Sequence, residues 1–314
     1  MTATSTFAGR AMGSPLRLQV TGVPVEGTAR PESLWQEAVD EFAAVDAALS
    51  CYRPDSDLSR LNGTAGSGMW RPASRRLYAF LATAERARRV TKGQFDPRVL
   101  PDLARLGHPG LVVPMASASR AGTPRREEVG WLDREPRTRS VRIRSAADSG
   151  GLGKGLALRW AGRHVAARLA GRGALLEAGG DITGWGRAPD GQPWQIGIED
   201  PGGATDPLAV ISLSNGAVCT SSIARQRWIA PDGRAVHHLV DPRTGEPGGE
   251  GLQAVTVGSD DPAWAEVWSK ALFLEGPQRI GEVARRLGLA AWWIEADGTL
   301  RMTPAARQRT TWTR

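Results

Sequence analysis

The sequence lacks long apolar runs and contains very few cysteines. No segment approaches the roughly 18 to 20 continuous apolar residues of a membrane-spanning helix, so we expect no membrane segment. Met1 to Ser14 shows no basic start followed by an apolar run, so no secretory signal is indicated. The 314 residues include two cysteines, Cys51 and Cys219, at no metal-ligand spacing. Such usage suits a reducing compartment, and we expect a cytoplasmic protein with two buried thiols.

Lysine is also scarce, because Lys92, Lys154 and Lys270 are the only lysines among 40 basic residues. The net charge of +7 and the pI near 10.3 raise the question of nucleic-acid binding. The densest arginines lie at helical spacing between residues 75 and 89, beside apolar residues at 77, 80, 81, 84 and 87. This pattern favours a solvated helix face. Since no zinc-finger, basic-zipper or RNA-binding signature accompanies it, we expect no nucleic-acid partner.

Hydrophobic periodicity predicts both helices and strands, in an irregular order. Helices are expected over 34–49 behind Ser33 as N-cap, over 74–90, over 156–169, and after Asp261-Pro262. The best strand candidates are Leu16 to Val20, Val141 to Arg144, Ala174 to Glu177, Trp194 to Ile198, Leu208 to Leu213 and Leu252 to Val257. The order and the hairpin-length gaps predict an α+β fold with largely antiparallel sheets. No linker or repeat divides the chain, and residues 102–140 are expected to form an irregular insertion.

The stretch Asp148 to Gly155 combines four glycines, a carboxylate and Lys154 where a helix is expected to begin. It is not a P-loop, because Asp148 and Gly155 stand where that motif needs Gly and Ser or Thr. The dinucleotide fingerprint fails on spacing. Glycines permit close approach, and a helix N-terminus with a lysine can hold a phosphate. The alternative is a glycine-rich turn with an exposed lysine.

Three further turns carry a carboxylate, at Asp96, Asp181 and Asp241. Asp before Pro commonly starts a turn, and Asp after Gly-Gly may simply cap one, so each has a purely structural explanation. Together with Thr220-Ser221-Ser222 and the His237-His238 pair, they favour a functional site built on the breaks between elements.

The order of these motifs resembles the ApbE family of FAD:protein FMN transferases. The blocks that carry the resemblance are Met12-Gly13-Ser14, Tyr52 to Ser56 with Leu61-Asn62, Gly93 to Pro97, Asp148 to Gly155, Glu177 to Asp181, Thr220 to Ser222, His238 to Gly245 and Ala265 to Phe273. They run in order from about residue 11 to 275. The resemblance therefore implies one ApbE-like domain over residues 1–314, with antiparallel sheets and packed helices.

What the resemblance implies is a magnesium-dependent enzyme that transfers FMN from FAD to a Thr or Ser hydroxyl of an acceptor flavoprotein and releases AMP. His238 would be the base for the acceptor hydroxyl, and Asp148 would be catalytic as well as FAD-binding. The main-chain carbonyl of Gly151 and the side chain of Glu266 would face Mg²⁺. The remaining FAD contacts implied are Met12, Tyr52, Phe95, Asp96, Pro97, Lys154, Thr220, Ser221, Leu239 and Lys270. The alternative for His238 is a structural histidine at a strand end, and His237 is expected to point the other way and be structural.

The chain departs from the family at the metal position. Where similar family members carry Ala-Asp and, four residues on, a Thr that binds magnesium, this chain has Ala265-Glu266 and Lys270. An ammonium group repels magnesium, which demands oxygen ligands. Either Glu266 and Lys270 form a helical i,i+4 pair that leaves the metal question open, or Lys270 takes the place of the metal and pairs with the FAD phosphates. Ser222, where the family usually has Gly, is a milder departure.

Three hypotheses follow for the function. The first is a cytoplasmic FAD:protein FMN transferase. The second is an FAD-binding protein with an impaired metal site and no transferase activity. The third is an FAD pyrophosphatase that releases FMN and AMP to water. A nucleic-acid binder, suggested only by the pI, is a distant fourth.

Overall fold

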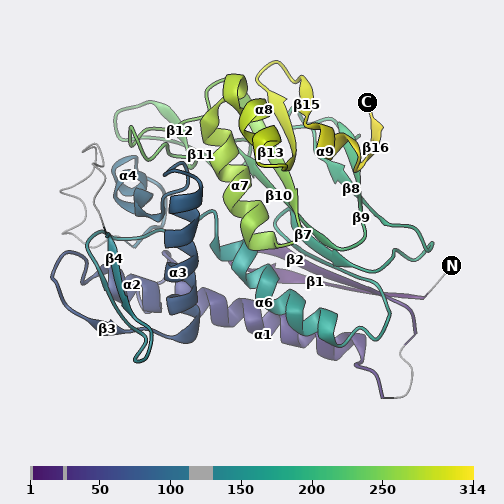
Figure 1. Ribbon diagram of the computed structural model, residues 1–314, viewed down its shortest axis with the longest axis horizontal. Coiled ribbons are helices and arrows are strands. Elements are labelled where there is room, and N and C mark those ends of the chain that lie inside the picture. The colour runs from purple at the N-terminus through teal and green to yellow at the C-terminus, as the bar shows by residue number, and fades with distance from the viewer. Residues whose placement is uncertain (1–2, 24–26, 113–129) are drawn as a thin grey trace. The chain divides into compact units, whose positions relative to one another are not determined.

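A computed structural model describes residues 3–23, 27–112 and 130–314 (Figure 1). The chain divides into two compact units. Unit 1 comprises Met1–Ala44, Lys154–Ser222 and Glu250–Arg314, and unit 2 comprises Val45–Gly153 and Ile223–Gly249. Helix α1 (Pro31–Leu49) begins in unit 1 and ends in unit 2. Within the described ranges no helix is both long and apolar enough to span a bilayer.

Unit 1 is organised by an eight-stranded sheet in the order β1-β2-β6-β7-β10-β13-β14-β15. Every neighbouring pair in it is antiparallel. Its strands are β1 (Thr4–Ala11), β2 (Ser14–Thr21), β6 (Ala174–Ala178), β7 (Asp181–Trp185), β10 (Gly216–Ser222), β13 (Leu252–Ser259), β14 (Ala290–Glu295) and β15 (Leu300–Met302). The prediction of an α+β fold with largely antiparallel sheets is confirmed.

A second sheet covers one face of the large one. Its order is β16-β9-β8, from β8 (Trp194–Ile198), β9 (Ala209–Leu213) and β16 (Thr310–Thr313). Alternate residues of β8 and β9 point into a core that they share with Val218 of β10, Ala254 of β13 and Trp292 of β14. Side chains alternate along a strand, so the neighbours of Val218 face the opposite side of the sheet.

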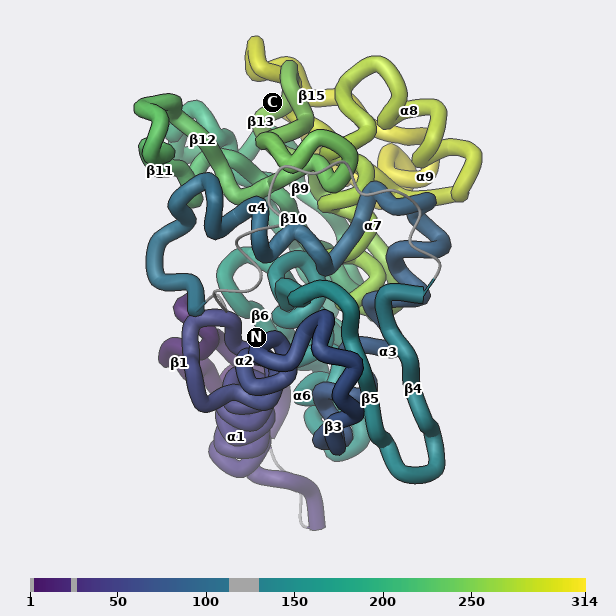
Figure 2. Tube along the Cα trace, turned by 90° about the vertical axis from the view of Figure 1, so that its left-hand side faces the viewer, coloured from purple at the N-terminus to yellow at the C-terminus, as the bar shows by residue number. Residues whose placement is uncertain are grey.

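Helices cover that opposite side (Figures 1 and 2). Ala217 and Cys219 of β10 pack on Ala265 of α7 (Pro262–Glu275). Helix α6 (Gly153–Ala167) passes so close to β7 that a Cβ at Gly162 would lie 2.6 Å from the ring of Trp185. Besides the first part of α1, unit 1 also contains α8 (Pro277–Arg286) and α9 (Pro304–Arg307). This layering brings the N-terminus of α6 and the middle of α7 to the same sheet face.

Unit 2 combines short helices with two small sheets. One sheet has the order β3-β5-β4, from β3 (Arg71–Pro72), β5 (Ser140–Ile143) and β4 (Leu132–Glu135), and the other pairs β11 (Arg227–Ile229) with β12 (Ala235–His237). Its helices are α2 (Asp57–Asn62), α3 (Arg75–Val90), the 3₁₀ turn η1 (Pro97–Val99) and α4 (Leu100–Arg105). The predicted apolar stripe of α3 is buried, and Arg75, Arg86 and Arg89 are exposed as expected. Arg88 is an exception, because its side chain is 23% exposed and pairs with Asp96.

Most predicted elements are confirmed, and two expectations are wrong. Asp261 caps α7 by accepting from the N–H of Ala263, as its sequence predicts. Ser33 is not an N-cap, because α1 begins at Pro31, where proline suits the first turn. The ends of the segment 102–140 are not irregular, since α4 and β4 enter it; residues 113–129 of that segment lie outside the described residues. The prediction of a single domain over the whole chain stays a prediction.

Candidate active site

Two tight hairpins of unit 1 turn at the same end of the large sheet. Met12 and Gly13 link β1 to β2, and Gly179 and Gly180 link β6 to β7, all four with positive φ. Two-residue loops of this kind require left-handed backbone at both positions. The N–H of Gly179 donates to the carbonyl of Pro15 at 2.9 Å, which holds the two turns side by side. The half-buried Met12, predicted to contact FAD, therefore lies at the same end of the sheet as the second turn, after which Asp181 begins β7.

Asp181 joins a cluster of charged side chains that are far apart in the sequence. Its Oδ2 accepts from the Nζ of Lys154, in the first turn of α6, and its Oδ1 accepts from the N–H of Thr220 at 3.0 Å. The same Lys154 Nζ lies 3.6 Å from Oε1 of Glu266 in α7. Glu266 Oε2 accepts from the N–H of Gly155 at 2.7 Å, which satisfies a donor of the α6 N-terminus. Four residues that lie far apart in the sequence thus meet in unit 1. Lys154, Thr220 and Glu266 were predicted as separate contacts, and Asp181 was noted only as a turn residue.

Gly155 makes this meeting possible. A Cβ at this position would lie 2.6 Å from the Cα of Ala263 and 2.9 Å from Oε2 of Glu266. Backbone atoms cannot move aside as a flexible side chain can, so α6 approaches α7 this closely only without a side chain here. The glycine therefore sets the distance between the lysine-bearing turn and the buried carboxylate.

The electrostatics of the cluster favour a charged lysine. Burial opposes the charge of Lys154, but the attraction of Asp181 and Glu266 is larger, so the pKa of Lys154 is raised above its usual value. Burial raises the pKa of Glu266; Lys154 opposes that rise, and Asp181 adds to it. Burial and the Asp181 charge also raise the pKa of the Cys219 thiol, which stays protonated and is not a nucleophile.

Hydroxyl groups surround the cluster on β10 and α7. Thr220 Oγ1 lies 2.9 Å from Thr256 Oγ1, and Ser221 Oγ lies 2.9 Å from Ser269 Oγ. Ser269 also donates to the carbonyl of Glu266 at 3.0 Å. The next residue, Lys270, is buried and close enough for its charge to lower the pKa of Glu266. The two predicted FAD contacts on β10, Thr220 and Ser221, therefore belong to the same unit as Lys154, Glu266 and Lys270.

The residues at the predicted metal position do not fit a magnesium ion. Mg²⁺ requires oxygen ligands in near-octahedral geometry at about 2 Å. Glu266 already faces an N–H donor with one oxygen and the ammonium of Lys154 with the other, and Lys270 adds a second ammonium nearby. Over residues 3–23, 27–112 and 130–314, no group of three or more His, Cys, Asp and Glu side chains is arranged to hold a metal ion. The carbonyl of Gly151, in unit 2, stays a predicted ligand only.

In unit 2, Asp148 is held by a backbone clamp. The amide side chain of Asn62 donates to the carbonyl of Ala147 and accepts from its N–H, both at 2.9 Å. The N–H of Asp148 donates to the carbonyl of Pro97 at 2.6 Å. The Asp148 block and the Phe95 to Pro97 block, predicted as separate FAD contacts, are thus joined directly.

The negative charge of Asp148 raises the pKa of two neighbouring side chains, Cys51 and Tyr52. Burial, followed by the Asp148 carboxylate, raises the pKa of the Cys51 thiol. The same two causes raise the pKa of Tyr52 above its usual value of 10.0, so its hydroxyl stays protonated. Tyr52 remains 53% exposed. An exposed ring next to a positioned carboxylate suits the predicted contact with FAD.

Asp96 has a structural role that its motif does not reveal. Its side chain is 3% exposed, and its oxygens accept from the backbone N–H and the guanidinium of Arg98 and from Arg88. Asp241 repeats this Asp-Pro-Arg arrangement with Arg243. Phe95 and Leu239 are fully buried in unit 2. FAD contacts by Asp96, Phe95, Pro97 and Leu239 stay predictions, and the hydrogen bonds assign Asp96 to holding its own turn.

His238 directly follows β12, so it lies at a strand end, which is where the alternative of a structural histidine places it. It is half-buried, and its role as a base stays a prediction. His237 is the last residue of β12, and its Nδ1 accepts from the N–H of Leu239 at 3.3 Å. Burial, with the nearby charge of Arg227, lowers the pKa of His237 to about 4. His237 is therefore neutral near pH 7, which agrees with the predicted structural role.

This lowered pKa predicts a loss of stability in mild acid. The unfolded chain protonates His237 near pH 6.5 and the folded chain only near pH 4, so the unfolded state binds more protons between these values and stability falls as the pH drops through this window. Urea unfolding from pH 7.5 to 4.5 should show this loss, and the variant His237→Gln should show a smaller one. An equal pH dependence in both proteins would contradict the assignment.

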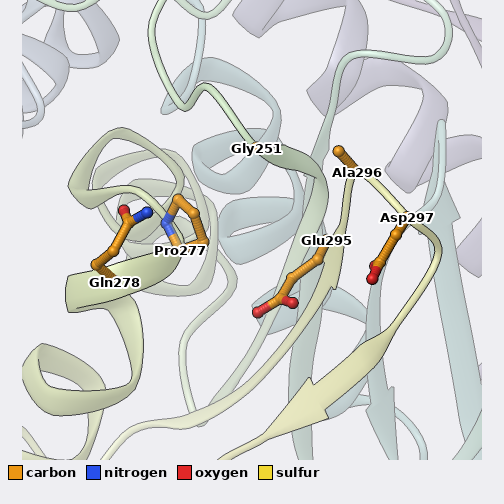
Figure 3. Close-up of a pocket in the computed structure, with 6 residues that line it drawn as sticks. All are labelled: Gly251, Pro277, Gln278, Glu295, Ala296 and Asp297. Atoms are coloured by element: carbon orange, nitrogen blue, oxygen red, sulfur yellow. The ribbon is translucent and has the colours of Figure 1, made fainter.

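A pocket of about 390 Å³ lies elsewhere in unit 1 (Figure 3). Its lining residues are Gly251, Pro277, Gln278, Glu295, Ala296 and Asp297. None of them belongs to the predicted site, and we assign no function to this pocket.

Sequence reasoning assigned no role in the site to Asn62 and Ser269, and it indicated Asp181 only as one of three acidic turns that favour a functional site. Asp181 follows a Gly-Gly turn, and Asn62 stands in a motif block, so each had a signal but no assigned partner. Ser269 stands in the Ala265 to Phe273 block, but its partner Ser221 is 48 residues away and no local pattern indicates that contact.

Comparisons with known proteins place the chain in a family. The ApbE family model matches residues 12–293. A curated FAD:protein FMN transferase of Salmonella typhimurium is 27% identical over 94% of this chain and 85% of its own length, and one of Haemophilus influenzae is 28% identical over 85% and 80%. The flavinyl transferase ApbE of Pseudomonas stutzeri has the same fold, with a TM-score of 0.81 and 28% identity over 98% of this chain and 97% of that one. The ApbE protein of Thermotoga maritima, at 23% identity and a TM-score of 0.84 over 98% of this chain and 99% of that one, supports the fold alone. With the family model covering most of its length, this chain belongs to the ApbE family.

Proposed function

We propose that this protein is an FAD:protein FMN transferase with a Thr or Ser hydroxyl of a flavoprotein as acceptor. The observation that carries the proposal is the lysine in the first turn of α6, whose charge is held by the buried carboxylates of Asp181 and Glu266. A fixed ammonium at a helix N-terminus, directly after a glycine-rich loop, suits the pyrophosphate of a dinucleotide. Relatives that match nearly the whole chain carry this activity in their names.

In the proposed reaction the acceptor hydroxyl oxygen bonds to the phosphorus on the FMN side of the FAD pyrophosphate. The bond from that phosphorus to the bridging oxygen breaks, and AMP leaves with the electron pair. The hydroxyl proton passes to a base, for which His238 is the candidate. Lys154 would neutralise charge on the pyrophosphate, and Thr220 and Ser221 would offer hydrogen bonds beside it. Cys51 and Cys219 are buried and form no disulfide, which supports a cytoplasmic location.

The test combines the purified protein with FAD and a peptide that contains a threonine acceptor site, in Mg²⁺ and in EDTA. AMP release together with a gain of one FMN in the peptide mass supports the transferase. AMP with free FMN and an unchanged peptide would mean an FAD pyrophosphatase. FAD binding without AMP in either condition would mean a binding protein.

Asp148→Ala should lower transfer by about 100-fold or more, the size of effect expected when a positioned acidic group is lost from an active site. Asp148 is predicted to bind FAD as well as to act in catalysis, so the loss should appear both in kcat and in the KM for FAD, measured by AMP release. Asp190→Ala, in an exposed turn of unit 1, is the matched control and should keep the parent rate. Near-normal transfer by Asp148→Ala would remove Asp148 from the catalytic set.

A further inference from the structure

Unit 1 contains a buried cluster in which two carboxylates lie beside cations that belong to the chain itself. The carboxylates of Asp181 and Glu266 are 2% and 6% exposed, and the ammonium of Lys154 lies beside both. The buried Lys270 stands one turn beyond Glu266 on the same face of α7. Two buried carboxylates normally need a cation, which in many proteins is a bound metal ion. Here two side chains of the chain itself supply the positive charge.

The carboxylate oxygens of the cluster are already engaged. Asp181 accepts from Lys154 with one oxygen and from the N–H of Thr220 with the other. Glu266 accepts from the N–H of Gly155 with one oxygen and faces Lys154 with the other. A divalent ion at Glu266 would have to displace Lys154 from that oxygen and would add two positive charges beside two ammonium groups.

We infer that the ammonium groups of Lys154 and Lys270 serve as the cations of this site, hold a dinucleotide pyrophosphate directly, and let FMN transfer proceed without a divalent metal. The inference rests on the proposed function and refines it. The bonds that form and break are those of the transfer reaction above. The difference is that side-chain ammonium groups, and no metal ion, neutralise the charge that develops on the departing AMP.

The metal arm of the test uses Mn²⁺ as the probe, detected by its paramagnetic resonance signal with and without FAD. The parent protein should leave the free Mn²⁺ signal unchanged. The double variant Glu266→Asp/Lys270→Thr removes one ammonium and supplies a carboxylate and a hydroxyl, so its Mn²⁺ affinity should rise at least about tenfold. Arg286→Thr, which removes the cation of an exposed i,i+4 pair with Glu282 on α8, is the matched control and should behave like the parent.

The ligand arm measures FAD affinity and AMP release in Mg²⁺ and in EDTA. For the parent protein, the FAD affinity and the rate of AMP release should each differ by less than about twofold between Mg²⁺ and EDTA. A twofold difference corresponds to only a small change in the free energy of binding or of activation. Stoichiometric Mn²⁺ binding by the parent, or an FAD affinity that drops at least about tenfold in EDTA, would overturn the inference. If no AMP appears in any condition, the proposed function fails, while the Mn²⁺ and FAD binding results still decide the question of the metal.

Discussion

Lys154→Met is expected to lower the free energy of unfolding by about 3 kcal/mol and to abolish FMN transfer. The variant leaves Asp181 and Glu266 buried without their shared cation, and breaking such a pair typically costs about 3 to 5 kcal/mol. Since Lys154 is 31% exposed, water partly screens its interactions, so the lower end of that range applies. Urea unfolding and the AMP assay measure the two effects.

The pH dependence of this variant gives an independent check. Burial and Asp181 already raise the pKa of Glu266, and Lys154 opposes that rise. Without the lysine the folded-state pKa of Glu266 rises further, so the folded state binds more protons than the unfolded state and its stability falls as the pH rises. The deficit of Lys154→Met should therefore be larger at pH 8 than at pH 5.

Two companion variants separate the buried-charge effect from a general loss of packing. Adding Glu266→Gln to Lys154→Met removes one unpaired charge and should restore part of the stability but not the transfer activity. Lys92→Met removes an exposed lysine in unit 2 and should change neither property. A Lys154→Met protein as stable as the parent at pH 8 would contradict the view that this ammonium balances the cluster.

The sequence predicts the helices that carry this cluster, but it does not predict that these helices contact each other. Asp261-Pro262 marks the start of α7, and the apolar pattern after the glycine loop marks α6, because caps and periodicity are properties of neighbouring residues. Glu266 accepts from Gly155, 111 residues earlier in the chain, and no local pattern encodes that contact. It follows from the packing of both helices on one face of the sheet and from the absence of a side chain at Gly155.

Some expectations failed because local rules compete. Ser33 is a good N-cap residue, but Pro31 is equally good in a first helical turn, and the structure follows the proline. The FAD contact of Asp96 stays a prediction, but its motif did not indicate that the carboxylate also accepts from Arg98, two residues on. Helix α8 was not predicted, although Ile280, Val283 and Ala284 are buried at helical spacing. In a short segment, three such residues are a weak signal.

Asn62→Ala is expected to destabilise the protein by about 3 kcal/mol, because the N–H and carbonyl of Ala147 both lose a hydrogen bond in the interior and each such loss costs about 1 to 3 kcal/mol. Asn62 itself is 1% exposed, so water cannot replace the lost bonds without entering the core. Asp148 is the next residue after Ala147, and releasing the clamp should misplace its carboxylate. FAD binding should therefore weaken in Asn62→Ala even at temperatures where the variant is fully folded.

Asn215→Ala provides the matched control, because Asn215 is exposed and accepts one hydrogen bond from the N–H of Gly186. It should change unfolding by less than about 0.5 kcal/mol, as surface substitutions usually do. Thermal unfolding and FAD titration of both variants complete the comparison. If Asn62→Ala loses stability but binds FAD with parent affinity, the clamp supports the fold of unit 2 and does not position Asp148. A loss of both means that the same two hydrogen bonds serve the fold and the site.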